Sequence, residues 1–432
     1  MSRPYHPYAP DQAFLLPISL VEAIDPEDAV HLSRSVLPRL NLDAVHEDYL
    51  CERGRPPFHP EAMTGLLLYG ACRGVYSSRR LAQACRDNVA FMYLMANARP
   101  DFRTISTFRK RFQDVLEGLF VQVLVLCREA GLVKLGHVSL DGTKVRANAS
   151  KHKAMSYGRM ALKEERLEAE IKRWFEEAER QDQAEDEEYG EDDDGYSVPP
   201  DIAESIKRLA TIKLGKGRLE QEARDKAEAA GKDPGEAVVS DRSQTNFTDP
   251  ESRIMHTPDG FQQCYNAQVA VDAESQVIVA YEVSQAPPDV QRLRPMLKRI
   301  ADFNGRAPRA LTADAGYASE SNFAALEEAG VHAVIALRRY HRDEPPDSNP
   351  APARSTNRWP HRNRMRDRLF SAEGKALYKL RKQTVEPVFG QIKGARGLRQ
   401  FLRRGQAAVR AEWALLCTVH NLLKLKQAPQ PI

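Results

Sequence analysis

Hydrophobic positions in the first third of the chain recur with a helical spacing. Between residues 60–112, apolar side chains return every three or four positions, and Ser77 is placed to cap one of the helices. Thr104 or Ser106 is expected to cap a later helical stretch. We therefore predict an all-helical N-terminal domain over residues 1–130.

From residue 137 onward the pattern changes to short apolar strands separated by amphipathic helices. A helix with its cap near Asp289 is expected between the third and fourth strands. The order predicts an α/β fold in which a mixed sheet is flanked by helices. The expected strands are residues 137–145, 265–273, 276–284, 309–314 and 331–337.

A highly charged insertion over residues 150–258 interrupts the α/β pattern. Two polar helices, at 159–180 and 201–231, flank the acidic sequence EDEEYGEDDDGYSVPP. They predict a projecting antiparallel arm with a disordered tip. The sheet domain is accordingly expected to comprise residues 131–149 and 259–426.

The composition excludes several classes of protein. No run approaches the ~18 uncharged apolar residues of a membrane span, and the N-terminus lacks an apolar signal core. The expectation is therefore a cytoplasmic protein without a membrane partner. The six cysteines include no CxxC pair, which argues against a zinc ribbon or a disulfide framework.

A net charge of +3 conceals a strong asymmetry. Residues 176–194 contain twelve acids and one base, so the rest of the chain carries +14. Residues 352–432 contain eighteen Lys or Arg and four acids. A segment this basic indicates either a polyanionic partner or a solvated basic tail.

Two aspartates follow apolar stretches, and a glutamate lies on a helix expected to cover the sheet. Asp141 and Asp314 are expected at strand ends, and Glu386 lies in the C-terminal helix. Three crowded carboxylates repel one another unless cations are present. Two divalent ions, Mg²⁺ or Mn²⁺, resolve that repulsion and stabilise both oxygens of a phosphodiester displacement.

The position of Glu386 depends on the proline that follows it. Because proline disfavours helical geometry at the preceding residue, Pro387 indicates that Glu386 lies at a kink or in the first turn of a new helix. Thr384 could cap that helix. Lys382 and Lys393 would share its face on an unbroken helix. The same spacing also fits an ordinary salt-bridge ladder.

Several segments together resemble the DDE transposases of bacterial insertion sequences, which have an RNase-H-like catalytic core. They are SLDGTKVRANASK (139–151), TDPESRIMHTPDGFQQCYNAQVAVD (248–272), LTADAGYASESNFAAL (311–326) and YKLRKQTVEPVFGQIKGARGLRQFLRRG (378–405). The helical N-terminal region also looks like that family's DNA-binding region. The resemblance implies an RNase-H-like fold for the sheet domain, with Asp141, Asp314 and Glu386 as catalytic and metal-binding residues.

The resemblance extends to a tyrosine, arginine, glutamate and lysine signature. Tyr378, Glu386 and Lys393 match it. The usual pattern places three residues between arginine and glutamate, whereas Arg381 has four and Lys382 stands at the expected position. Either cation is therefore a candidate for the phosphate contact.

Further DNA contacts are expected in the N-terminal helices and the basic C-terminal segment. The helices read as a helix-turn-helix unit, or as a helical bundle with a basic face. The candidates are Arg79, Arg80, Arg109, Arg111, Arg396, Arg399, Arg403 and Arg404.

The resulting hypothesis is a transposase that cuts DNA at the ends of its element and joins those ends to target DNA. Its partners would be double-stranded DNA, as terminal inverted repeats and target, and a second copy of the chain in a homodimer on DNA. The DNA-bound protein would associate with the bacterial nucleoid. The alternatives are an RNase-H-like nuclease without joining activity and a non-catalytic DNA-binding relic.

Overall fold

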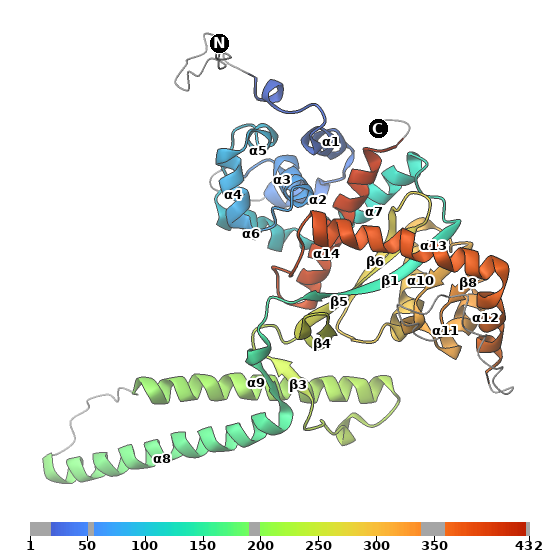
Figure 1. The fold of residues 1–432 in the computed structure, drawn as a ribbon. Helices are drawn as coiled ribbons and strands as arrows, with labels where there is room; N and C mark the ends of the chain where they lie inside the picture. The colour runs from blue at the N-terminus through green and yellow to red at the C-terminus, as the bar shows by residue number, and fades with distance from the viewer. Residues whose placement is uncertain (1–18, 51–55, 190–198, 338–358, 429–432) are drawn as a thin grey trace, which may run out of the picture.

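The computed structural model describes residues 19–50, 56–189, 199–337 and 359–428. A group of N-terminal helices adjoins a mixed sheet with its covering helices, and a long two-helix arm projects from the sheet (Figure 1). This confirms the predicted α/β fold with a helical N-terminal region and a helical insertion. Within the described ranges we find no helix that meets both the length and the hydropathy that a membrane span requires.

Aspartate and asparagine caps start three of the N-terminal helices. Asp28, Asn88 and Asp101 each accept a hydrogen bond from a backbone N–H two residues later. The prediction that Thr104 or Ser106 caps the later stretch is therefore wrong, because the helix already begins after Asp101. The helices are α1 (Ala29–Val36), α2 (Asp43–Leu50), α3 (Pro60–Cys72), α4 (Ser78–Asp87), α5 (Val89–Leu94), α6 (Phe102–Arg111) and α7 (Gln113–Glu129).

The sheet has the RNase-H-like order β6-β5-β1-β7-β8. The first three strands of this order are antiparallel, whereas β7 and β8 run parallel to β1. The strand β4 extends the sheet by pairing with the first half of β5. The strands are β1 (His137–Arg146), β4 (Arg253–Thr257), β5 (Gly260–Asp272), β6 (Ile278–Ser284), β7 (Ala310–Ala313) and β8 (His332–Ile335).

Helices cover this sheet and join it to the N-terminal region. The helix α13 crosses β5, β1, β7 and β8, whereas α14 packs on β6, α7 and α3 (Figure 1). One continuous hydrophobic cluster therefore extends from the N-terminal helices into the sheet. The domain boundary at residue 130 stays a prediction. The covering helices are α10 (Leu293–Asn304), α11 (Glu320–Glu328), α12 (Pro360–Phe370), α13 (Ala372–Phe389) and α14 (Gln406–Leu425).

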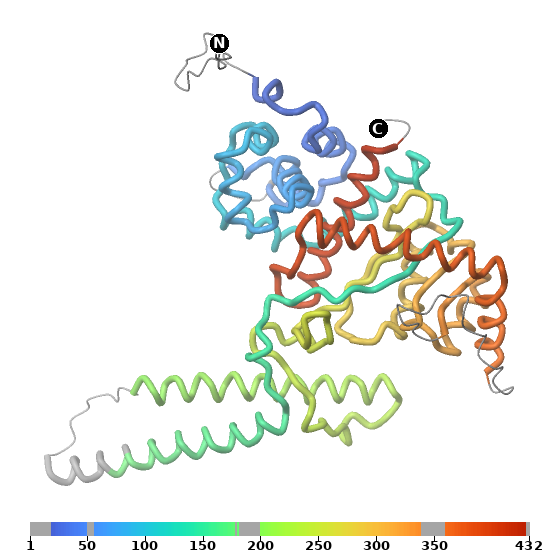
Figure 2. The backbone as a smooth tube through the Cα atoms, viewed as in Figure 1, coloured from blue at the N-terminus to red at the C-terminus, as the bar shows by residue number. Residues whose placement is uncertain are grey.

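The insertion forms an arm with a small core of its own. The long helices α8 (Tyr157–Tyr189) and α9 (Pro200–Ala229) lie side by side, and the short strands β2 (Ala154–Ser156) and β3 (Gln244–Asn246) pair at their base. Figure 2 follows the chain from the end of β1 directly into this arm. Met160, Leu167, Ile212 and Leu219 form its hydrophobic cluster. Most of the predicted disordered tip, residues 190–198, lies outside the described residues.

The helix α13 continues through Pro387, so Glu386 begins no new helix. Thr384 donates to the carbonyl of Leu380 one turn earlier instead of capping a helix. Pro387 has no N–H for the carbonyl of Gln383, and the side chain of Gln276 donates to that carbonyl at 3.0 Å instead. A π-helical turn, Gly390–Ala395, follows α13 directly.

Candidate active site

The sheet brings Asp141 and Asp314 together. β1 continues to Arg146, so Asp141 lies in mid-strand and not at a strand end as predicted. The parallel partner β7 ends opposite Leu140, with Ala313 as its last residue. Asp314 follows Ala313 directly, so both aspartates lie where β7 leaves β1.

Asp141 is a largely buried carboxylate with one cationic partner. Its Oδ2 lies 2.7 Å from Nη1 of Arg381, and its Oδ1 accepts the Gly142 N–H at 2.8 Å. Burial raises the pKa of Asp141 to about 6, with the Arg381 charge lowering it and the nearby Asp314 charge raising it. Arg381 therefore offsets part of the repulsion between the two aspartates.

Asp314 starts a tight turn that leaves no room for a larger residue at Gly316. Its Oδ1 accepts the Gly316 N–H at 2.8 Å. A Cβ at Gly316 would lie 2.9 Å from Oδ1 of Asp314 and 3.3 Å from Oδ2 of Asp289. The glycine thus allows two carboxylates to approach the same turn.

The helix α13 places two signature residues against this pair. Arg381 lies 5.9 Å from the ring centre of Tyr378, and burial raises the pKa of Tyr378 near both aspartates. Lys382 is exposed. Of the two candidate cations, Arg381 is therefore the one that faces the aspartates.

Lys393 contacts β1 close to Asp141. Its Nζ donates to the hydroxyl of Thr143 and, at 3.0 Å, to the carbonyl of Lys144. Burial lowers the pKa of Lys393. Thr143 and Asp141 share one face of β1 because side chains alternate along a strand. The same face of the sheet therefore meets Arg381 and Lys393.

Glu386 is not brought together with the aspartates in this structure. It is exposed, and among the described residues no three His, Cys, Asp or Glu side chains are grouped closely enough to hold a metal ion. Glu386 is five positions after Arg381, which corresponds to about 140° around a helix. Asp141 and Asp314 do offer adjacent carboxylate oxygens, the donors that Mg²⁺ and Mn²⁺ prefer.

Asp289 belongs to the site, although the sequence predicted only a helix cap near this residue. Its side chain makes no cap hydrogen bond. Its Oδ1 accepts hydrogen bonds from Asn266 at 2.6 Å, Gln268 at 2.7 Å and Lys144 at 3.3 Å. The hydroxyl of Tyr317 donates to Gln268. This network braces the turn after Asp314 from the opposite face of β1. In the sequence, this network is indicated by Asn266 and Gln268, two polar residues at alternate positions of an otherwise apolar strand.

Two arginines expected to contact DNA, Arg403 and Arg109, make contacts within the protein where α6 meets α7. The Nη2 of Arg403 donates to Gln113 at 2.7 Å, and its Nη1 donates to the carbonyl of Arg109 at 3.4 Å. Burial lowers the pKa of Arg109 to about 10, with the Glu412 charge opposing that shift. Glu412 accepts the backbone N–H groups of Leu402 and Arg403.

The remaining arginines divide into buried and exposed groups. Arg396 is only 6% exposed, with the Tyr76 hydroxyl bound to its carbonyl, so a DNA contact by its side chain does not fit this placement. Arg111 pairs with Asp48. The other predicted contacts, Arg79, Arg80, Arg399 and Arg404, are exposed.

Two protein-family models match the chain. A transposase domain (DUF772) matches residues 18–111, and a transposase DDE domain matches residues 236–422. The chain belongs to the DDE transposases. The first match covers the N-terminal helices, and the second covers most of the sheet together with Asp314 and the helix α13 that carries Glu386. No curated protein and no solved structure matches this transposase.

Membership in this family confirms the resemblance seen in the sequence. A transposase of an insertion sequence acts on DNA, and DDE transposases generally use a divalent metal. The family match begins at residue 236 and so leaves Asp141 outside it. For Asp141 the supporting observation is its position beside Asp314.

Proposed function

We propose that this transposase cuts DNA at the ends of its element and transfers the cut strands into target DNA. The observation that carries the proposal is the meeting of Asp141 and Asp314 where β7 leaves β1, in a chain of the DDE family. Asp141, Asp314 and Glu386 are the proposed catalytic residues. They would hold two Mg²⁺ or Mn²⁺ ions.

The ions would activate the attacking oxygen and stabilise the leaving one. Arg381 prepares the site by neutralising Asp141 while the site holds no cation. The network of Asp289 and Gln268 fixes the turn that carries Asp314. Glu386 would reach the aspartates by a rotation of the end of α13. Pro387 and the π-helical turn that follows are the places where the regular α-helical geometry is interrupted.

The proposed partners are terminal inverted repeats, target DNA and a second copy of the chain. Exposed Arg79 and Arg80 on α4 and exposed Arg399 and Arg404 after α13 are the proposed phosphate contacts. Two element ends must be held together for joining, which is the reason to propose a homodimer on DNA. We also propose that residues 1–130 form the DNA-binding domain.

The test is metal-dependent cleavage of DNA that carries the gene's own flanks. Wild-type protein is compared with Asp141→Asn, Asp314→Asn and Glu386→Gln, with Glu373→Gln as the matched control. Glu373 is another exposed glutamate of α13. We expect cuts at the repeat ends and joined products from wild type and control. Each of the three active-site variants should lose at least about 10³-fold in rate.

The alternatives predict different outcomes of the same experiment. Cutting without joined products, under conditions that pair the ends, would show a nuclease. Tight binding to the ends with no cutting in either metal would show a non-catalytic relic. A Glu386→Gln protein that cuts at the wild-type rate would remove Glu386 from the proposed triad.

A further inference from the structure

An open pocket of about 500 Å³ lies where the arm leaves the sheet. It is bordered by the end of β1, the turn that leads into β2, and the loop that precedes α14. Its lining includes Arg146, Lys151, His152, Lys153 and Arg404 and contains no acidic residue. A concave surface with this charge is suited to an anionic ligand.

Three cations of the pocket have no ion-pair partner among the residues that the structure describes. Arg146, Lys151 and Lys153 are exposed, and none of them makes an ion pair with a residue in the described part of the chain. Within the described ranges, Arg404 donates only from its Nε, to the carbonyl of Asn148 at 3.0 Å. The pocket therefore presents positive charge without internal compensation.

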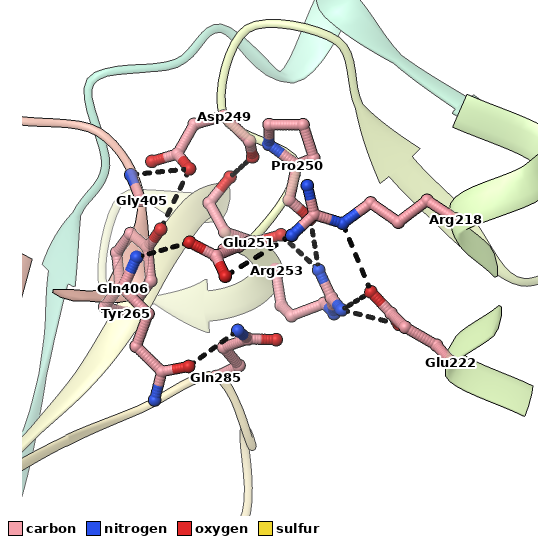
Figure 3. Close-up of polar contacts among 11 residues, drawn as sticks. Arg218, Glu222, Asp249, Pro250, Glu251, Arg253, Tyr265, Gln285, Gly405 and Gln406 are labelled. Atoms are coloured by element: carbon pink, nitrogen blue, oxygen red, sulfur yellow. Dashed lines mark hydrogen bonds and ion pairs between the residues drawn. The ribbon is translucent and has the colours of Figure 1, made fainter. Parts of the chain in front are cut away.

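Two acids close to the pocket in sequence, Asp249 and Glu251, make contacts within the protein. Oδ1 of Asp249 accepts the Tyr265 hydroxyl at 2.9 Å and the Gly405 N–H at 3.2 Å. Glu251 accepts the Gln406 N–H at 2.6 Å and lies 3.3 Å from Arg218 of α9 (Figure 3). In the described part of the chain, neither carboxylate forms an ion pair with a cation that lines the pocket.

These contacts also hold the arm in place and shape the pocket in advance. Arg253 of β4 makes two hydrogen bonds to Glu222 of α9, at 2.9 and 2.8 Å (Figure 3). Gln400 donates to the carbonyl of Ala147 at 2.9 Å, and Asn246 donates to that of Ser150 at 2.8 Å. The loop, the turn and the strand end are therefore tied to one another before any ligand arrives.

The pocket and the proposed active site lie at two levels of a single strand, and Arg146 and Asp141 project from opposite faces of it because side chains alternate along a strand. Arg146 and Asp141 both belong to β1 and lie five residues apart. At ~3.3 Å per residue this separation is about 17 Å. B-DNA rises ~3.4 Å per base pair along a strand, so the same distance spans about five base pairs.

We propose that this pocket binds the phosphate backbone of the DNA about five base pairs from the phosphate that is cut. The inference rests on the proposed function, because the cut is assigned to Asp141. Lysine and arginine side chains at the pocket recognise phosphate charge and not base identity, so the pocket sets the register of the duplex. The base of the arm thereby becomes part of the DNA interface.

The first test is the salt dependence of DNA binding without metal. The full-length pocket variant Arg146→Gln/Lys151→Gln/Lys153→Gln is compared with Arg224→Gln/Lys226→Gln/Lys232→Gln. The control removes the same charge from exposed positions of the arm that do not line the pocket. Thermal melting checks that both variants fold.

Loss of three phosphate contacts should lower the slope of log affinity against log salt by about 2 to 3. At 0.1 M salt the affinity should fall on the order of 10²-fold, with the control close to wild type. Equal slopes in the pocket variant and the control would overturn the proposal. Binding is read without metal, so failure of cleavage in wild type would leave this result intact.

Phosphate ethylation interference on the bound duplex supplies a second test. In wild type, ethylation about five base pairs from the cut should block binding, and the pocket variant should lose that interference. The same pattern in both proteins would show that the pocket contacts no backbone phosphate. If the pocket-dependent interference were found at a distance from the cut other than about five base pairs, the proposed spacing along β1 would be wrong.

Discussion

Two opposing influences act on the carboxylate of Asp141. Burial favours its neutral form and raises its pKa to about 6, whereas the Arg381 guanidinium favours the ionised form. Only the ionised form binds a divalent cation. The protonation state of this one residue should therefore control the loading of the proposed site.

The cleavage rate should fall about tenfold per pH unit once the pH drops below the pKa of Asp141. In metal-free protein that pKa is about 6. Metal ions and protons compete for the same carboxylate, so a higher Mg²⁺ concentration should move the midpoint to lower pH. Single-turnover cleavage measured against pH at several Mg²⁺ concentrations checks both expectations. A midpoint that ignores Mg²⁺ would assign the titration to another group.

Removing the Arg381 charge should move the same midpoint upward. Arg381→Gln leaves Asp141 buried without its cation, so its ionised form is harder to reach. Lys382→Gln is the matched control, because Lys382 is the neighbouring exposed cation. The measured quantity is the midpoint of the pH profile. The maximal rate is not used, because loss of a phosphate contact by Arg381 or Lys382 would also change it. Equal shifts in both variants would contradict the assignment.

At the scale of elements, α13 depends on a turn of the sheet to satisfy its backbone. Pro387 leaves the Gln383 carbonyl without its partner in the helix, and Gln276 supplies one. The same Gln276 accepts a hydrogen bond from Lys424 of α14 at 2.9 Å. The turn between β5 and β6 thus connects both C-terminal helices.

Gln276→Ala should lower the free energy of unfolding by about 1 kcal/mol, because it removes the partner of that carbonyl. In a Pro387→Ala background, Gln276→Ala should destabilise the protein by roughly 0.5–1 kcal/mol less, because the N–H of residue 387 then pairs with the Gln383 carbonyl within the helix. Chemical denaturation of the four proteins gives the coupling. The pair Lys298→Ala and Pro387→Ala serves as the control and should be additive, because the side chain of Lys298 bonds to Asp302 and shares no partner with this network. Additivity in the first pair would refute the coupling.

At the scale of the whole molecule, the arm and the body have separate hydrophobic clusters. The two ends of the arm lie next to each other, because Ser156 pairs with Gln244 and the Tyr157 N–H donates to the carbonyl of Ser243 at 2.8 Å. Its contacts with the body are partly exposed ion pairs, which contribute little to stability. The body is therefore expected to fold without the arm.

Replacing residues 158–242 with two glycines should lower the melting temperature of the body by no more than about 4 °C. Scanning calorimetry measures this against the full chain. As a control, Leu167→Ala should destabilise the arm by about 2–4 kcal/mol and leave the body transition in place, because Leu167 belongs only to the arm cluster. Loss of a cooperative body transition in the deletion variant would show that the two parts fold together.

The sequence by itself determined the order of β1, β5, β6, β7 and β8, the arm and the proximity of two aspartates, whereas it assigned β4 to the insertion. Periodicity fixes these features because burying an apolar face depends on local spacing. Asp141 and Asp314 meet although β1 runs past Asp141, since β7 ends at that level. The error in strand length therefore left the prediction of their proximity unaffected.

Only the tertiary structure decided which side chains face one another. Arg381 and Lys382 are adjacent in sequence, yet one step along a helix turns a side chain by about 100°, and packing of α13 directs Arg381 to Asp141. Packing likewise buries Arg396, brings Arg403 into contact with α6 and α7, and leaves Glu386 exposed. Charge and spacing identify such residues as candidates, whereas their partners lie hundreds of residues away in the chain and are brought into contact only by the fold.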